Sequence, residues 1–187
     1  KFEKVMNVPQ GSLVEKHIDG SSTMRILHYP PQKNSIIKKN QIRGGAHTDY
    51  GSITLLWRFD DVPGLQIYDK GNDEWIDAPI IENSLVLNVA DMFARWTNDI
   101  LKSTPHRIVN ADLTRPRYSM PYFVDPGRDV MIENMTSQPS KYRPISAYEY
   151  LKWRLAQSYI DDNYKENTNI SVDSSQHLPE ESNYSSS

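Results

Sequence analysis

Short apolar runs separated by turn residues fill the middle of this 187-residue chain. They cover residues 53–57, 65–68, 75–78 and 84–89, and turns that contain Asp, Gly, Asn or Pro fall between them. The first run is mostly apolar and is typical of a buried strand, whereas the second alternates as a half-buried strand does. Short strands joined by turns indicate an antiparallel sandwich or barrel.

Strand-like segments also lie on either side of this region. Residues 24–29 have strand composition and stop at Pro30 and Pro31, and residues 106–109 and 117–124 resume the same character. Proline ends a strand because it has no N–H to donate to a neighbouring strand. The sequence therefore predicts a mainly β domain.

One short helix is expected within residues 91–99, after the last of the central strands. Met92, Phe93 and Trp96 recur there at helical spacing, and Asp91 is a suitable N-cap residue.

A second, longer helical pattern covers residues 145–164. Ser146 is a possible cap, with Glu149 three residues later. We expect this C-terminal helix to pack on the sandwich through one apolar stripe. The stripe consists of Tyr148, Leu151, Leu155, Tyr159 and Ile160.

These patterns divide the chain into three parts. Residues 1–20 are interpreted as the end of a preceding N-terminal region, and the start at Lys1 suggests that this region is truncated. Residues 21–165 form the predicted domain with its C-terminal helix. Residues 166–187 are rich in Ser, Asn, Asp and Glu, so we expect a disordered tail.

Composition excludes several classes of function. The 21 basic and 24 acidic residues nearly cancel, which argues against nucleic-acid or membrane partners. No long apolar run could span a bilayer. The absence of cysteine excludes disulfides, zinc–thiolate sites and cysteine nucleophiles. It also fits a reducing compartment, so the predicted location is cytoplasmic.

His47 and Asp49 are the candidate start of a metal site. They are two residues apart, so in an extended segment both side chains point to the same face. Two histidines and one carboxylate on one side of a metal form the facial triad of non-haem Fe(II) oxygenases. Of the remaining histidines, His106 is the best third ligand because it opens a strand after a turn. The others are His17, His28 and His177.

Arg117 and Ser119 strengthen this interpretation. They are again two residues apart on one predicted strand, shortly after the candidate ligand histidine. Arginine suits the bidentate grip of a carboxylate, and serine adds another donor. The pair could therefore anchor the far end of a metal-chelating dicarboxylate.

The ordered set resembles the Fe(II)/2-oxoglutarate-dependent dioxygenases of the isopenicillin N synthase-like family, in their C-terminal catalytic region. The resemblance runs from about Met24 to Pro126. Besides the residues above, it includes Tyr29-Pro30-Pro31, Val62-Pro63-Gly64-Leu65-Gln66-Ile67, Trp75-Ile76, Asp91-Met92, Trp96-Thr97-Asn98 and Tyr122-Phe123-Val124-Asp125-Pro126.

This resemblance implies a double-stranded β-helix, a distorted jelly roll with the metal at its mouth. It implies Fe(II) at His47, Asp49 and His106, and 2-oxoglutarate held by Arg117 and Ser119 with a further hydrogen bond from Tyr29. Phe123 would pack against the primary substrate. The implied activity uses O2 to couple oxidative decarboxylation of 2-oxoglutarate to hydroxylation or desaturation of a small organic substrate. Trp96 and Asn98 would be structural.

The sequence is also compatible with other interpretations. The chain could be an iron-dependent oxidase that does not use 2-oxoglutarate, a non-catalytic jelly-roll binding module, or a protein with a structural zinc site. The basic residues within 32–43 fit a solvated loop better than a lid over an anionic substrate. Several aromatic residues could belong either to the core or to a substrate pocket. They are Tyr50, Trp57, Trp96, Tyr122 and Phe123.

Overall fold

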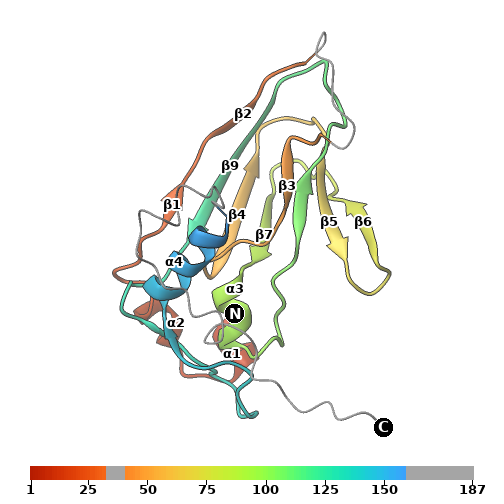
Figure 1. The fold of residues 1–187 in the computed structure, drawn as a ribbon. Coiled ribbons are helices and arrows are strands. Elements are labelled where there is room, and N and C mark those ends of the chain that lie inside the picture. Colours follow the sequence, from red (N-terminus) through yellow and green to blue (C-terminus); the bar gives the residue numbers. More distant parts are fainter. Residues whose placement is uncertain (33–40, 159–187) are drawn as a thin grey trace.

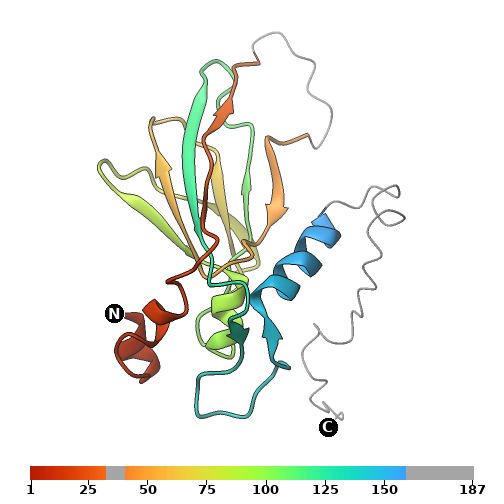
Figure 2. The same ribbon diagram turned by 90° about the vertical axis from the view of Figure 1, so that its left-hand side faces the viewer.

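Two antiparallel sheets face each other, and the helices gather at one end of them (Figure 1 and Figure 2). The computed structural model describes residues 1–32 and 41–158. The strands are β1 (Thr23–Met24), β2 (Leu27–Tyr29), β3 (Gly44–His47), β4 (Ile53–Arg58), β5 (Leu65–Asp69), β6 (Glu74–Asp77), β7 (Leu85–Val89), β8 (His106–Ile108), β9 (Arg117–Val124), β10 (Met131–Ile132) and β11 (Ile145–Ser146). The helices are α1 (Phe2–Met6), α2 (Ser12–Glu15), α3 (Asp91–Trp96) and α4 (Ala147–Ser158).

The larger sheet has the strand order β1-β9-β4-β7, and β2 also pairs with β9. The smaller sheet has the order β3-β8-β5-β6, and β10 pairs with β11 apart from both. Neighbours in sequence are therefore often not neighbours in a sheet, which is expected when strands alternate between two sheets. The predicted double-stranded β-helix, a mainly β fold with a C-terminal helix, is confirmed.

Strand β9 has the predicted boundaries and a regular alternation of burial. Arg117, Ser119 and Pro121 are buried, whereas Tyr118 and Tyr122 are exposed. Successive side chains of a strand point to opposite faces, so the two polar residues of the Arg-x-Ser pair both face inward. The inner face of β9 thus carries a charged group into the space between the sheets.

The predicted strand 24–29 is interrupted, because β1 and β2 are separate. Both pair with β9, on either side of Pro121. The Arg25 backbone N–H donates to the Pro121 carbonyl at 3.0 Å, but proline has no N–H to return to Arg25. One ladder hydrogen bond is therefore missing at the position where the two strands are divided.

Residues 53–57 form a strand as predicted, but the prediction that this strand is buried is wrong. Thr54 is buried, whereas Trp57 is 49% exposed. In the β4–β7 register Leu55 faces Leu87 and Trp57 faces Leu85, and both of these leucines are exposed as well. These apolar side chains share the outer face of the larger sheet, while Thr54 faces the second sheet.

The main hydrophobic core lies at the helical end of the molecule. Its fully buried centre is Trp96, against which Phe93 packs edge-on at 6.2 Å between ring centroids. Phe2 of α1 contacts Phe93 in the same geometry at 5.0 Å. Burying aromatic side chains of this size contributes roughly 1.5–3 kcal/mol each. The remaining buried members are Met92, Ile132, Ile145, Ala147 and Tyr150.

Asp91 was expected to cap α3, and this prediction is wrong. The N-cap is Ala90, with extended backbone, and no side chain caps the helix. The first amides of α3 are already satisfied, because Asp91 N–H donates to the Asp49 carbonyl and Met92 N–H to the Gly51 carbonyl, both at 2.9 Å. The backbone carbonyls of residues 49 and 51 therefore take the place of a capping side chain at these two amides.

Helix α4 begins two residues later than predicted, since residues 145–146 form β11. The Ser146 hydroxyl accepts the backbone N–H of Glu149 at 3.2 Å, which confirms the predicted cap. The buried tyrosine of this helix is Tyr150 and not the predicted Tyr148, which is exposed.

Three predicted features lie outside the described residues. They are residues 33–40 of the basic segment 32–43, the end of the apolar stripe at residues 159–160, and the tail 166–187. Within the described part of the chain, no helix combines the length and the hydrophobicity that crossing a bilayer requires.

Candidate metal centre and its two cavities

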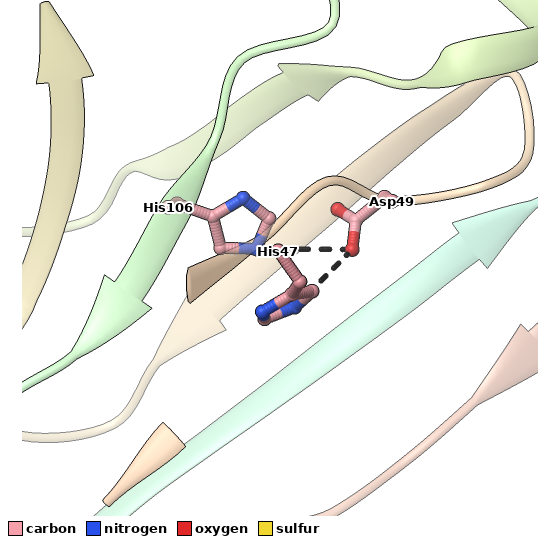
Figure 3. Close-up of side chains that lie close together, drawn as sticks. All are labelled: His47, Asp49 and His106. Carbon is pink, nitrogen blue, oxygen red and sulfur yellow. Dashed lines mark ion pairs between the residues drawn. The ribbon is translucent and has the colours of Figure 1, made fainter. Parts of the chain in front are cut away.

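His47 and His106 come together across the smaller sheet. They are direct partners in the β3–β8 register, and their ring centroids are 4.4 Å apart. Asp49 follows β3 by two residues and reaches both rings: its Oδ1 lies 3.8 Å from His47 Nε2 and 3.7 Å from His106 Nε2 (Figure 3). The structure thus brings together the three side chains that the sequence predicted as ligands.

The spacing of these three atoms fits one small divalent cation. One potential ligand atom from each residue lies within 4.8 Å of the other two. A metal bound at about 2.1 Å from each donor separates donors by about 3–4 Å, depending on the angle. Two imidazoles and one carboxylate are the donor set of non-haem Fe(II) sites, and zinc can occupy the same set.

The Asp49 carboxylate is oriented by two hydrogen bonds to one of its oxygens. Thr54 Oγ1 donates to Oδ2 at 2.7 Å, and Asn88 Nδ2 donates to the same atom at 2.8 Å. Oδ1 therefore remains for a metal, and Asp49 itself is buried. Partners of this kind hold a ligand side chain in place and tune its affinity.

Sequence reasoning did not identify Thr54 and Asn88. The sequence feature that could have identified them is a polar residue within an otherwise apolar strand. The two residues are cross-strand partners in β4 and β7. On the inner face of a sheet, such residues need a hydrogen-bond partner.

Both histidines have their Nδ1 atoms turned to backbone carbonyls. His47 Nδ1 lies 2.8 Å from the Gly45 oxygen, and His106 Nδ1 lies 3.3 Å from the Thr104 oxygen. Nδ1 then carries the proton, and Nε2 presents a lone pair toward Asp49. Burial lowers the pKa of His106 below its ordinary 6.5, against an opposing effect of Asp49, so this imidazole is neutral at pH 7. Three lone-pair atoms converge, an arrangement that a cation stabilises.

The segment that carries His47 and Asp49 is fixed from two sides. Thr48 Oγ1 donates to Asp91 Oδ2 at 3.2 Å and accepts from Arg154 Nη2 of α4 at 3.0 Å. Arg154 also pairs with Asp91 at 3.3 Å. On the other side, a Cβ at position 51 would clash with the Asp125 side chain and lie 2.8 Å from the Val124 oxygen, so only glycine fits.

A cavity of about 290 Å³ connects the three candidate metal ligands to the Arg-x-Ser pair. Arg117 is only 1% exposed, and its Nη1 donates to Ser119 Oγ at 3.4 Å. Within the described residues, Arg117 Nε and Nη2 are buried without a hydrogen-bond partner. Burial lowers the pKa of the Arg117 guanidinium, since charge is disfavoured there. A carboxylate in the cavity would supply the missing acceptors.

Tyr29 and Phe123 line the same cavity. Tyr29 is the cross-strand partner of Arg117, whose guanidinium carbon lies 5.2 Å from the centre of the tyrosine ring. All the predicted site residues therefore border one space. Leu27 lines it too and pairs with Ser119 in register.

A second, larger cavity of about 510 Å³ meets the first at two of the candidate ligands. His47, Asp49 and Phe123 line both cavities. The apolar stripe predicted for α4 borders this larger space, with Tyr148, Leu151 and Leu155 among its lining residues. The stripe was expected only to pack on the sandwich, but its side chains also line this cavity.

The other candidate residues have separate surroundings. Tyr50 lines the larger cavity, whereas Trp57 and Tyr122 are exposed and line neither cavity. His17 Nε2 lies 2.8 Å from Ser52 Oγ, and the His28 ring stacks on Tyr118 at 4.6 Å. Position 177 lies outside the described residues.

Trp96 and Asn98 have structural contacts, as expected. Trp96 is in the core, and Asn98 binds the segment around residue 140 through both ends of its amide.

Comparison with protein families gives one match over most of the β domain. The model of the 2OG-Fe(II) oxygenase superfamily matches residues 20–126, which include every predicted ligand and co-substrate residue.

Two curated relatives are fungal proteins. The chain is 37% identical over 145 residues to the 2-oxoglutarate-Fe(II) type oxidoreductase hxnY of Emericella nidulans, covering 75% of this chain and 41% of that protein. It is 32% identical over 168 residues to the proline hydroxylase buaE of Petromyces alliaceus, covering 82% and 52%. The chain spans about half the length of the relatives it matches.

Solved structures show the same arrangement of strands. A full-length Neurospora crassa protein in complex with alpha-KG and thymine matches with a TM-score of 0.76 and 39% identity, over 84% of this chain and 50% of that one. A 2OG-Fe(II) oxygenase family protein of Caulobacter crescentus matches with a TM-score of 0.72 and 34% identity, over 83% and 52%.

Proposed function

Because this chain belongs to the 2OG-Fe(II) oxygenase superfamily, we propose that it forms the catalytic region of an Fe(II)- and 2-oxoglutarate-dependent oxygenase. The reaction couples oxidative decarboxylation of 2-oxoglutarate to hydroxylation or desaturation of a small organic substrate. One observation carries this proposal. A buried arginine with open donors lies at one end of a cavity whose other end holds two histidines and an aspartate.

In this proposal His47, Asp49 and His106 hold Fe(II). Thr54 and Asn88 keep Asp49 Oδ2 occupied, so that Oδ1 is the ligand atom. With three protein donors, such a site would leave coordination positions for 2-oxoglutarate and O2. When bound, Fe(II) and 2-oxoglutarate together supply the chemistry that reduces O2 and oxidises the substrate.

Arg117 binds the distal carboxylate of 2-oxoglutarate. Its Nε and Nη2 donate to the carboxylate, and Ser119 adds its hydroxyl on the same face of β9. Tyr29 lies beside Arg117 and donates a further hydrogen bond. Fixing the far end of the co-substrate directs its keto-acid end to the metal ligands, and such positioning supplies much of the catalytic gain.

The primary substrate occupies the larger cavity. Phe123 lines both cavities and packs against the substrate, and the α4 side chains Leu151 and Leu155 also border the larger one. Apolar walls exclude water from the reacting atoms, which protects the oxidation from side reactions.

Three further sequence expectations stay predictions. The domain is taken as residues 21–165, the subfamily as isopenicillin N synthase-like, and the location as cytoplasmic. Limited proteolysis followed by mass spectrometry would test the domain boundaries, and cell fractionation would test the location.

Anaerobic addition of 2-oxoglutarate to the Fe(II)-loaded protein tests the proposal. A 2-oxoglutarate-dependent absorption band is expected, followed by O2 uptake and succinate formation once air is admitted. Substrate oxidation without succinate would favour an iron oxidase that does not use 2-oxoglutarate. A folded protein that binds Fe(II) but gives no band would favour a binding module. Loss of the fold on chelation would favour a structural zinc site.

A further inference from the structure

Two arginines at the larger cavity have no carboxylate partner in the part of the chain that the structure describes. Arg25 and Arg128 both line this cavity, and both are exposed. Among the described residues, the structure gives neither guanidinium a hydrogen bond or an ion pair. By contrast, Arg154, close to the same cavity, pairs with Asp91, and Arg58 in the larger sheet donates to two backbone carbonyls.

Each of these arginines is held over an aromatic ring of the same cavity. The Arg25 guanidinium carbon lies 5.6 Å from the ring centre of Phe123, and that of Arg128 lies 4.5 Å from Tyr148. Phe123 and Tyr148 are themselves lining residues. A cation–π contact restricts where a guanidinium lies but uses none of its five N–H donors. Both groups therefore retain their full capacity to bind an anion.

The negative charges of the cavity lining are buried, whereas its two arginines are exposed. Its two carboxylates, Asp49 and Asp125, are buried, and Asp49 belongs to the metal ligands. The apolar lining includes Met92 and the α4 leucines. Within residues 1–32 and 41–158, the cavity thus combines two buried carboxylates, apolar side chains and two exposed arginines that have no ion-pair partner. A volume of about 510 Å³ is in the range of pockets for small organic ligands.

We propose that the primary substrate carries a carboxylate, which Arg25 and Arg128 bind while its apolar body lies against Phe123 and α4. This inference rests on the proposed function, because it assigns the larger cavity to the oxidised substrate. Guanidinium groups bind carboxylates through paired N–H donors, and two of them converging on one cavity select against a neutral analogue.

Matched ligands separate this proposal from general apolar binding. The probes are 3-phenylpropionate and its neutral amide, 3-phenylpropionamide, which differ in charge but hardly in size. Binding is measured by saturation-transfer NMR and titration calorimetry on Fe(II)-loaded protein under argon, with 2-oxoglutarate at saturation so that the probe cannot occupy the co-substrate cavity. We expect the acid to bind at least about tenfold more tightly than the amide, since a hydrogen bond to a charged group contributes that much.

Variants assign the effect to the two arginines. Arg25→Gln and Arg128→Gln should each weaken binding of the acid about tenfold and leave the amide unchanged, and the corresponding lysine variants should recover part of the loss. Arg115→Gln is the matched control, because Arg115 pairs with Asp61 and Asp112 and lines neither cavity. It removes the same charge and should bind the acid like the wild type.

Equal affinity for acid and amide overturns the inference, and so does full acid binding by both glutamine variants. Failure of the acid to bind while the 2-oxoglutarate absorption band is present overturns it as well. Absence of that band instead refutes the proposed function. In that case the acid–amide comparison on metal-free protein still decides whether the two arginines form an anion site.

Discussion

His47 and His106 are direct partners in the antiparallel pair of β3 and β8, with ring centroids 4.4 Å apart. Because side chains alternate along a strand, a one-residue slip of this register would turn one imidazole to the opposite face. The correct pairing of the smaller sheet is therefore a condition for the metal site, and Asp49 joins it from the loop that follows β3.

Thr54→Val tests the orientation of Asp49. This change removes the hydroxyl that donates to Asp49 Oδ2 at 2.7 Å and keeps the side-chain volume. We expect the affinity for Mn(II) or Fe(II) to fall about 10–100-fold, as for other groups that orient a metal ligand. Titration followed by electron paramagnetic resonance of free Mn(II) measures it. Thr54→Ser retains the hydroxyl and should bind metal like the wild type; equal losses in both variants would instead indicate a packing defect.

Arg117→Met tests the co-substrate site. The variant fills similar space but removes the buried guanidinium, so the apparent Kd for 2-oxoglutarate should rise by at least about 100-fold. The metal affinity should change less than about threefold, because Arg117 is not among the grouped ligands. Anaerobic titration of the absorption band gives both values. An unchanged Kd for 2-oxoglutarate would remove Arg117 from the proposed role.

Arg154→Met tests the link between α4 and the ligand-bearing segment. Arg154 binds both Thr48 and Asp91, so its loss leaves a buried carboxylate without this cationic partner. We expect a loss of roughly 1–3 kcal/mol in the free energy of unfolding, measured with urea. Lys152→Met on the same helix is the control, since Lys152 pairs with the exposed Glu149 and should change stability little. Equal effects of the two changes would show that the link contributes nothing specific.

Asp125 makes the free energy of unfolding of the metal-free protein depend on pH. Burial and the nearby Asp49 raise its pKa from 3.8 to about 6, so the folded state binds this proton more tightly than the unfolded state does. Stability from the protonated form is fully present below about pH 4 and is lost as the pH rises through about 6.

Asp125→Asn should remove this dependence. Above about pH 6 the variant should be more stable than the wild type by about 1–3 kcal/mol, and the two should converge toward about pH 4. Urea unfolding of metal-free protein at several pH values measures the difference. A constant difference across the range would contradict the raised pKa.

Local sequence patterns predicted most of the strands and the shared direction of the His47–Asp49 and Arg117–Ser119 pairs, because both depend on short-range alternation. The boundaries of β9, the inward direction of Arg117 and Ser119, and the Ser146 cap all follow from neighbours within a few residues. The third candidate ligand required more, since no local rule brings His106 to β3. Its selection rested on its position at the start of a strand and on resemblance to a family.

The errors share one physical cause, which is that tertiary pairing decides what a local pattern leaves open. Asp91 is a good capping residue, but Ala90 is the N-cap, and carbonyls of residues 49–51 accept the first two α3 amides. Residues 24–29 favour a single strand, but Pro121 of a distant strand interrupts it. The apolar residues of β4 indicate burial, but several of them lie on the outer face of the sheet.

A metal titration of the His106→Ala variant tests the central claim most directly. Under anaerobic calorimetry, the wild-type chain should bind one equivalent of Fe(II), and His28→Ala should do the same because His28 stacks on Tyr118 outside the ligand group. His106→Ala should lose at least about 100-fold in affinity while remaining folded, since one of its three protein ligands is gone. Wild-type affinity in this variant would contradict a metal site shared by His47, Asp49 and His106.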